Sequence, residues 1–208
     1  MPNNHITRIV LTGGPCAGKT TTLALIIEHF TQKGYKVFAI PEVPTIFTQA
    51  GMNYLTTNKD FFYEGEKATL EIQLMFEDRF YRMAQTCTEP CLIVYDRGAM
   101  DISAYMQPET WEEITASVGT SSAELIKRYD AIFHLKTAAH GASKYYNTAT
   151  NAQRYEEATE EGMQIARMLD DKVLAAWSTH PRRTIISTND DFVFKMNQVI
   201  SGIEEVLK

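Results

Sequence analysis

The feature that most constrains this chain is a glycine-rich segment near its start, GGPCAGKT at residues 13–20. It carries every fixed position of the phosphate-loop pattern G-x-x-x-x-G-K-[ST]. An apolar run at residues 8–12 predicts a short buried strand before it, and residues 21–30 predict a helix after it. A strand, a glycine loop and a helix start present backbone N–H groups and the positive end of a helix dipole to one anion. The segment therefore predicts a site for the phosphates of a nucleotide.

The residues of this loop have separate expected roles. We expect Lys19 to reach the outer phosphates and the hydroxyl of Thr20 to bind Mg²⁺. Glycines let the backbone approach a phosphate and adopt positive φ angles. The predicted nucleotide-binding residues are Gly13, Gly14, Pro15, Cys16, Ala17, Gly18, Lys19, Thr20 and Thr21. The alternative is a glycine-rich turn without a ligand, but a chance match in a chain of this length is roughly a one-in-a-hundred event.

Composition narrows the class of protein further. A chain of 208 residues is most simply one domain. Its net charge of −6 argues against a surface that coats nucleic acid, which is normally basic. No apolar run approaches the roughly 18 residues that cross a bilayer, and we see no signal-peptide pattern. The three cysteines lack the spacing of a zinc site and indicate a reducing compartment, so we expect a cytoplasmic protein without membrane insertion.

Polar residues follow several of the predicted strands. Apolar runs predict further strands at residues 36–40, 91–95, 130–135 and 184–187. In a parallel α/β sheet the carboxyl ends of the strands face one ligand crevice. Glu42 follows the strand 36–40 on a stiff turn between Pro41 and Pro44. It is a candidate general base for a substrate hydroxyl or a holder of a magnesium-bound water; the alternative is a solvated turn glutamate.

Two neighbouring residues after the strand 91–95 suggest a metal and phosphate site. Asp96 stands where phosphate-loop enzymes organise the magnesium shell, so we predict it as a metal ligand. Arg97 is expected to pair with a phosphate or with the substrate, and the alternative for both is an ion pair that caps the next helix. In the helix predicted over residues 63–86, Gln73 lies beside the apolar stripe and is a candidate for contacting the substrate.

The second half of the chain supplies more candidates. Residues 137–152 are poor in large aliphatic side chains and predict a mobile surface loop. Arg154, at the start of a helix predicted over 153–179, is placed to swing onto a transferring phosphate; the alternative is a surface ion pair. Asn189 follows the last strand and is a candidate for reading the nucleotide base, or a plain turn former. His134 is predicted to be a core histidine rather than a ligand.

The motifs GGPCAGKT, PEVP, YDRG, RYDAIFHL and RYE, in this order, resemble one family closely. It is the AAA-type ATPase domain shared by the ribosylnicotinamide kinase part of NadR and the TRPL translocation defect protein of flies. The resemblance covers the chain from residue 7 to about residue 200. It implies a three-layer α/β P-loop NTPase fold of about five parallel strands with helices on both faces and a kinase-like lid near residues 138–155. We expect a single nucleoside triphosphate-binding domain over residues 1–208.

More distantly, the pattern is similar to that of deoxynucleoside kinases. In those enzymes a glutamate after the second strand is the base, a glutamine on a later helix reads the substrate, and an acid–arginine pair follows the third strand. The resemblance places these roles on Glu42, Gln73, Asp96 and Arg97. Deoxynucleoside kinases have glutamate where this chain has Asp96.

The leading functional hypothesis is an Mg²⁺-dependent kinase or NTPase. It binds ATP or GTP and transfers a phosphoryl group to the hydroxyl of a small-molecule acceptor, or hydrolyses the nucleotide. Its expected catalytic residues are Lys19, Glu42, Asp96 and Arg154. One alternative is a non-enzymatic switch or binding module that responds to ATP or GTP, and another is a degenerate structural domain. The choice of nucleotide, the acceptor and the oligomeric state are left open.

Overall fold

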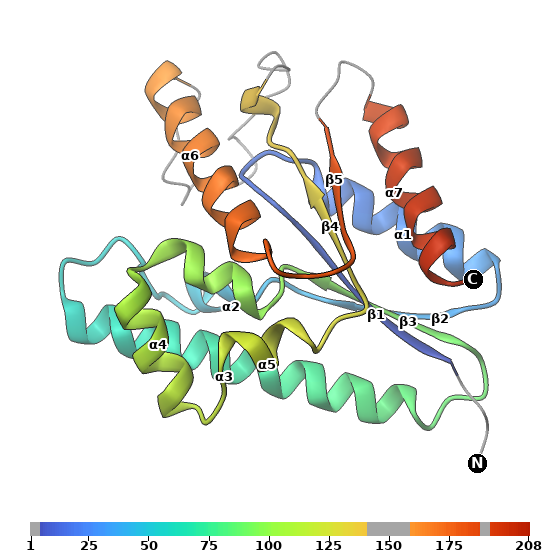
Figure 1. The fold of residues 1–208 in the computed structure, drawn as a ribbon, viewed down its shortest axis with the longest axis horizontal. Helices are drawn as coiled ribbons and strands as arrows, with labels where there is room; N and C mark the ends of the chain where they lie inside the picture. Colours follow the sequence, from blue (N-terminus) through green and yellow to red (C-terminus); the bar gives the residue numbers. More distant parts are fainter. Residues whose placement is uncertain (1–4, 141–158, 188–191) are drawn as a thin grey trace.

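The computed structural model describes residues 5–140, 159–187 and 192–208, which build a five-stranded sheet with helices on both faces (Figure 1). The strands lie in the order β2-β3-β1-β4-β5, and all four pairings are parallel. They are β1 (Ile6–Gly13), β2 (Lys36–Ile40), β3 (Cys91–Asp96), β4 (Ala131–Leu135) and β5 (Arg183–Ile186). The predicted α/β fold with five parallel strands is confirmed.

The helices divide between the two faces of the sheet. Helices α1 and α7 pack on one face, and α3, α4, α5 and the 3₁₀ helix η1 pack on the other, while α6 packs against η1 (Figure 1). Among the described helices, none has the length and apolar character that crossing a bilayer requires. The helices are α1 (Lys19–Gln32), α2 (Val43–Gln49), α3 (Lys59–Ala84), η1 (Ala99–Tyr105), α4 (Pro108–Ser117), α5 (Ser122–Ile126), η2 (Ala138–His140), α6 (Glu160–Ala176) and α7 (Phe192–Val206).

The central strands are buried on both sides, which explains their continuous apolar sequences. In β1, Val10 belongs to the cluster under α3, whereas Ile9 and Leu11 belong to the cluster under α1 and α7. The same alternation places Ile93 and Leu92 of β3 in opposite clusters. Successive side chains of a strand point to opposite faces, so two covered faces require apolar residues at every position.

The segment after β2 differs from its prediction. A stiff turn is expected at Pro41–Pro44, but α2 begins at Val43 with Glu42 as its N-cap residue and a proline in its first turn. Proline suits that position because its missing N–H would have no helical partner there. Glu42 therefore stands at a helix start rather than on an isolated turn.

The sheet brings the predicted polar residues toward one edge. Leu11 of β1 pairs in register with Asp96 at the end of β3, and Gly13 pairs with Leu135 at the end of β4. The loop that follows β1 therefore starts beside the carboxyl ends of both neighbouring strands.

Candidate functional site

The glycine-rich loop between β1 and α1 has a backbone that only certain residues can adopt. Gly13 has φ 141°, Cys16 has φ 54° and Gly18 has φ 86°. A Cβ atom at Gly13 would lie 2.1 Å from the carbonyl oxygen of Leu135, so glycine is required where the loop leaves β1. Gly18 is the N-cap of α1, and no side chain of the described residues caps that helix start. The first N–H groups of α1 have no helical partner, which makes them donors for an anion.

Lys19 lies over the loop that precedes it. Its Nζ atom donates to the carbonyl oxygens of Gly13 at 3.2 Å and Gly14 at 3.3 Å. Burial, and secondly the positive charge of Arg97, lower the pKa of Lys19, while nearby carboxylates oppose the shift. The side chain is thus held at the loop, with its charge in an environment where a phosphate would be a strong partner.

Asp96 has the properties expected of a metal ligand. Its Oδ1 atom is buried and has no hydrogen-bond partner in the part of the chain that the structure describes. Burial raises the pKa of Asp96, which means that its charged form needs a cation; Lys19 partly opposes this shift. An unsatisfied buried carboxylate oxygen beside a phosphate loop fits Mg²⁺, which prefers oxygen ligands. Thr20, the other predicted ligand, is exposed in the first turn of α1.

Glu42 and Arg97 form an ion pair that bridges the ends of β2 and β3. The Nε atom of Arg97 donates to Oε1 of Glu42 at 2.5 Å, and its Nη1 atom lies 3.4 Å from the carbonyl oxygen of Gly13. Burial opposes ionisation of Glu42, but Arg97 and then Lys19 hold the pKa of this carboxyl below its usual value. Glu42 is therefore a carboxylate that an arginine already pairs, and taking up a proton would require this pair to loosen.

The backbone of Arg97 is itself unusual. Its φ angle of 68° lies in the left-handed region, which costs a non-glycine residue about 1–2 kcal/mol. Two hydrogen bonds fix the conformation: the N–H of Arg97 donates to the carbonyl of Leu11, and the next N–H, of Gly98, donates to buried Asp101. Asp101 also accepts from the hydroxyl of Thr12 at 2.7 Å. The strained conformation is thus held by hydrogen bonds to Leu11 and, through Asp101, to Thr12 of β1. In this conformation the side chain of Arg97 points toward the loop.

Gln73 points toward the same region from α3. Its Nε2 atom donates to Oε1 of Glu77 at 2.9 Å and approaches the carbonyl oxygen of Arg97 at 3.5 Å. Glu66, two turns earlier on the buried side of α3, has a pKa that burial raises to about 8. Whether Gln73 contacts a substrate stays a prediction.

Sequence reasoning missed the residue that anchors the loop. Asp170 of α6 is fully buried, and its Oδ1 atom accepts from the N–H of Gly14 at 2.7 Å and from Nε2 of His134 at 3.0 Å. Burial opposes ionisation, yet these donors and Lys136 hold the pKa of Asp170 below its usual value. His134 is therefore the buried core histidine that its setting predicts, and its partner comes from a helix 36 residues later.

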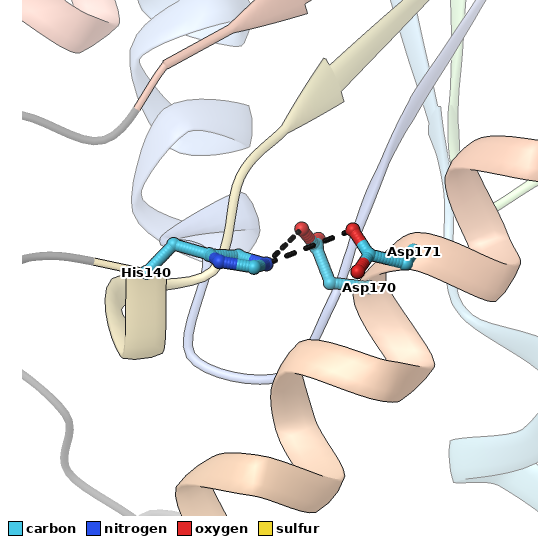
Figure 2. Close-up of side chains that lie close together, drawn as sticks. All are labelled: His140, Asp170 and Asp171. Carbon is cyan, nitrogen blue, oxygen red and sulfur yellow. Dashed lines mark ion pairs between the residues drawn. The ribbon is translucent and has the colours of Figure 1, made fainter.

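Asp170 also belongs to a cluster with His140 and Asp171, shown in Figure 2. The Nε2 atom of His140 lies 3.5 Å from Asp170 Oδ2 and 3.7 Å from Asp171 Oδ1. The ammonium of Lys136 lies closer to the same two oxygens, at 3.1 Å and 2.9 Å. A metal ion would have to displace this ammonium, so the cluster is an ion-pair network between η2 and α6.

Three parts of the prediction lie outside the described residues. Arg154 and most of the expected lid at 138–155 fall within residues 141–158, and Asn189 falls within 188–191. Their roles remain predictions.

The fold and the loop define the class of protein. A parallel sheet, a glycine-rich loop that leads into a helix whose first residue is a lysine, and an acid at the end of the adjacent strand make this a P-loop nucleotide-binding domain. The chain belongs to the AAA domain family, whose model matches residues 8–192. This confirms the resemblance at the level of P-loop ATPase domains; the narrower kinship with NadR and the fly protein stays a prediction.

One solved structure shares this architecture. Thymidylate kinase from Ehrlichia chaffeensis is 12% identical to this chain and superposes with a TM-score of 0.58, over 98% of this chain and 100% of the kinase chain. At that identity the likeness shows a shared fold. No curated protein matches the chain.

Proposed function

We propose that the protein is an Mg²⁺-dependent phosphotransferase that uses ATP or GTP and a small-molecule acceptor bearing a hydroxyl group. One observation carries the proposal. A candidate base, Glu42, comes from the end of β2 into the same charged cluster as Lys19 and Asp96, since the charge of Lys19 lowers the pKa of Glu42 and the charge of Glu42 raises the pKa of Asp96. A domain that only bound nucleotide would need the loop and the acid but not the base.

Each group has a defined task in this scheme. The loop amides and Lys19 bind the β- and γ-phosphates and stabilise the charge that spreads over the phosphoryl oxygens. Thr20 and Asp96 would hold Mg²⁺, which neutralises negative charge on the phosphates when it is bound. Arg97 is close enough to the loop, through Gly13, to contact a phosphate or the acceptor.

The chemical step is a transfer of one phosphoryl group. The acceptor oxygen forms a bond to the γ-phosphorus as the bond to the bridging oxygen breaks, and the nucleoside diphosphate leaves with that oxygen. The hydroxyl proton passes to a carboxylate oxygen of Glu42. Because Arg97 lowers the basicity of Glu42, the acceptor must draw the two side chains apart before the proton moves.

Replacing Glu42 by glutamine is expected to reduce turnover by about 10²–10⁴-fold, because the amide keeps the shape of the side chain but takes no proton. The affinity for ATP should change by less than about threefold, since Glu42 is not placed on the loop. The measurement is product formation from ATP and GTP with a panel of nucleosides, ribosylnicotinamide and related alcohols. Glu113→Gln, an exposed carboxylate of α4, is the matched control.

The same panel of acceptors also gives the results that would contradict the proposal. Tight nucleotide binding without any phosphorylated product would contradict a kinase. Release of phosphate without an acceptor would instead indicate an NTPase. The absence of both reactions, with nucleotide binding intact, would favour a nucleotide-dependent switch.

A further inference from the structure

A buried lysine of the C-terminal helix contacts the phosphate loop. Lys195 of α7 is 4% exposed, and its Nζ atom donates to the carbonyl oxygen of Ala17 at 3.0 Å and to that of Lys136 at 2.6 Å. Helix α7 lies beside α1 on one face of the sheet (Figure 1). A second contact joins the same two parts, because the ring of Phe192 lies where a side chain on Gly18 would stand.

The position of this ammonium has an electrostatic consequence. The carbonyl of Ala17 and the N–H of Gly18 belong to one planar trans peptide, so they point in opposite directions. A positive charge that hydrogen-bonds to the oxygen polarises the whole peptide and makes its N–H a stronger donor. Burying a lysine is costly unless its charge is paired or hydrogen-bonded, and within the described residues this ammonium donates to two carbonyl oxygens.

We propose that Lys195 is a positioning residue for phosphate binding, which polarises the Ala17–Gly18 peptide and fixes the loop against the segment that follows β4. The inference rests on the proposed phosphate-binding role of the loop. It means that α7, which lies outside the loop motif, contributes directly to the affinity for triphosphates.

The groups around Lys195 predict when this effect disappears. The pKa of Lys195 is lowered to about 8, chiefly by burial; Asp170 on α6 opposes this shift and Lys19 on α1 adds to it. The side chain of Lys136 itself turns to Asp170 and Asp171 and offers Lys195 only its backbone carbonyl. The ammonium is therefore present at neutral pH and lost under moderately alkaline conditions.

The test compares ATP with AMP by calorimetry in Mg²⁺, at about pH 7 and about pH 9.5, on either side of the pKa. We expect the wild-type affinity for ATP to fall about tenfold between these conditions, and that for AMP by less than about twofold. Lys195→Met should bind ATP about tenfold more weakly at the lower pH and lose the pH dependence. Lys195→Arg should keep its affinity for ATP at both pH values, and Lys127→Met, which removes an exposed charge, should match the wild type.

Several outcomes would overturn the inference. A folded Lys195→Met protein with wild-type affinity for ATP would do so, and so would equal losses for ATP and AMP, which indicate general damage. A pH dependence that persists in Lys195→Met would belong to Lys19 instead. If wild-type protein binds ATP as expected here but phosphorylates no acceptor, the kinase proposal fails and this inference stands; if it binds no triphosphate, both fail.

Discussion

Replacing Lys19 by alanine is expected to weaken the binding of ATP or GTP at least about 100-fold, a loss of about 2.7 kcal/mol or more. The ammonium is held at the carbonyls of Gly13 and Gly14 within the loop. Charge-assisted hydrogen bonds contribute about 1.5–3 kcal/mol each, and we expect Lys19 to make two with the β- and γ-phosphates. Calorimetric titration with each nucleotide in Mg²⁺ measures the change.

The control for this substitution separates local charge from net charge. Lys127→Ala removes an exposed ammonium in the turn before β4 and should leave the affinity unchanged. The free energy of unfolding of Lys19→Ala should stay within about 1 kcal/mol of the wild type, because its described contacts are to loop carbonyls. An unchanged affinity in a folded Lys19→Ala protein would refute the assigned role of the loop.

Replacing Asp170 by alanine is expected to lower the free energy of unfolding by about 3–5 kcal/mol. The substitution leaves the N–H of Gly14 and the ring of His134 without their buried acceptor, and it removes one carboxylate from Lys136. Asp171→Ala is the matched control, since that side chain is 63% exposed and its contact with Lys136 should be worth under about 1 kcal/mol. Denaturant unfolding of the three proteins measures both changes. Equal losses in the two variants would contradict the anchoring role of Asp170.

The same carboxyl predicts how stability depends on pH. The pKa of Asp170 is lower in the folded protein than in the unfolded chain, because His134, Gly14 and Lys136 outweigh the effect of burial. Its contribution is therefore present above the unfolded pKa of about 3.9 and is lost as pH falls through the folded value. Wild-type protein should lose stability more steeply than Asp170→Ala in this acid range. A parallel dependence in the two proteins would show that other carboxyls dominate.

The elements that the sequence predicts are those determined by a pattern of neighbouring residues. The strand–loop–helix unit at residues 6–32 follows from its glycines and its apolar runs, and the central strand Cys91–Asp96 follows from being apolar throughout. Because strand ends in a parallel sheet share an edge, sequence reasoning alone could place Glu42 and Asp96 near the loop.

The supporting contacts could not be predicted in this way. Asp170 reaches Gly14 across 156 residues and Lys195 reaches Ala17 across 178, and both look like ordinary polar positions of amphipathic helices. Their partners depend on which turn of a helix packs over the loop. The pairing of Arg97 with Glu42, 55 residues away, depends in the same way on the left-handed backbone of Arg97.

The most direct test of the nucleotide-binding loop is a titration of the wild-type protein with ATP and GTP, with and without Mg²⁺. We expect saturable binding of at least one of the two, strengthened by Mg²⁺ because Asp96 carries a buried oxygen that needs a cation. At a ligand concentration about one hundred times the dissociation constant, the bound nucleotide should also add about 2.7 kcal/mol to the free energy of unfolding. No binding of either nucleotide, in protein that is demonstrably folded, would contradict the role assigned to the loop.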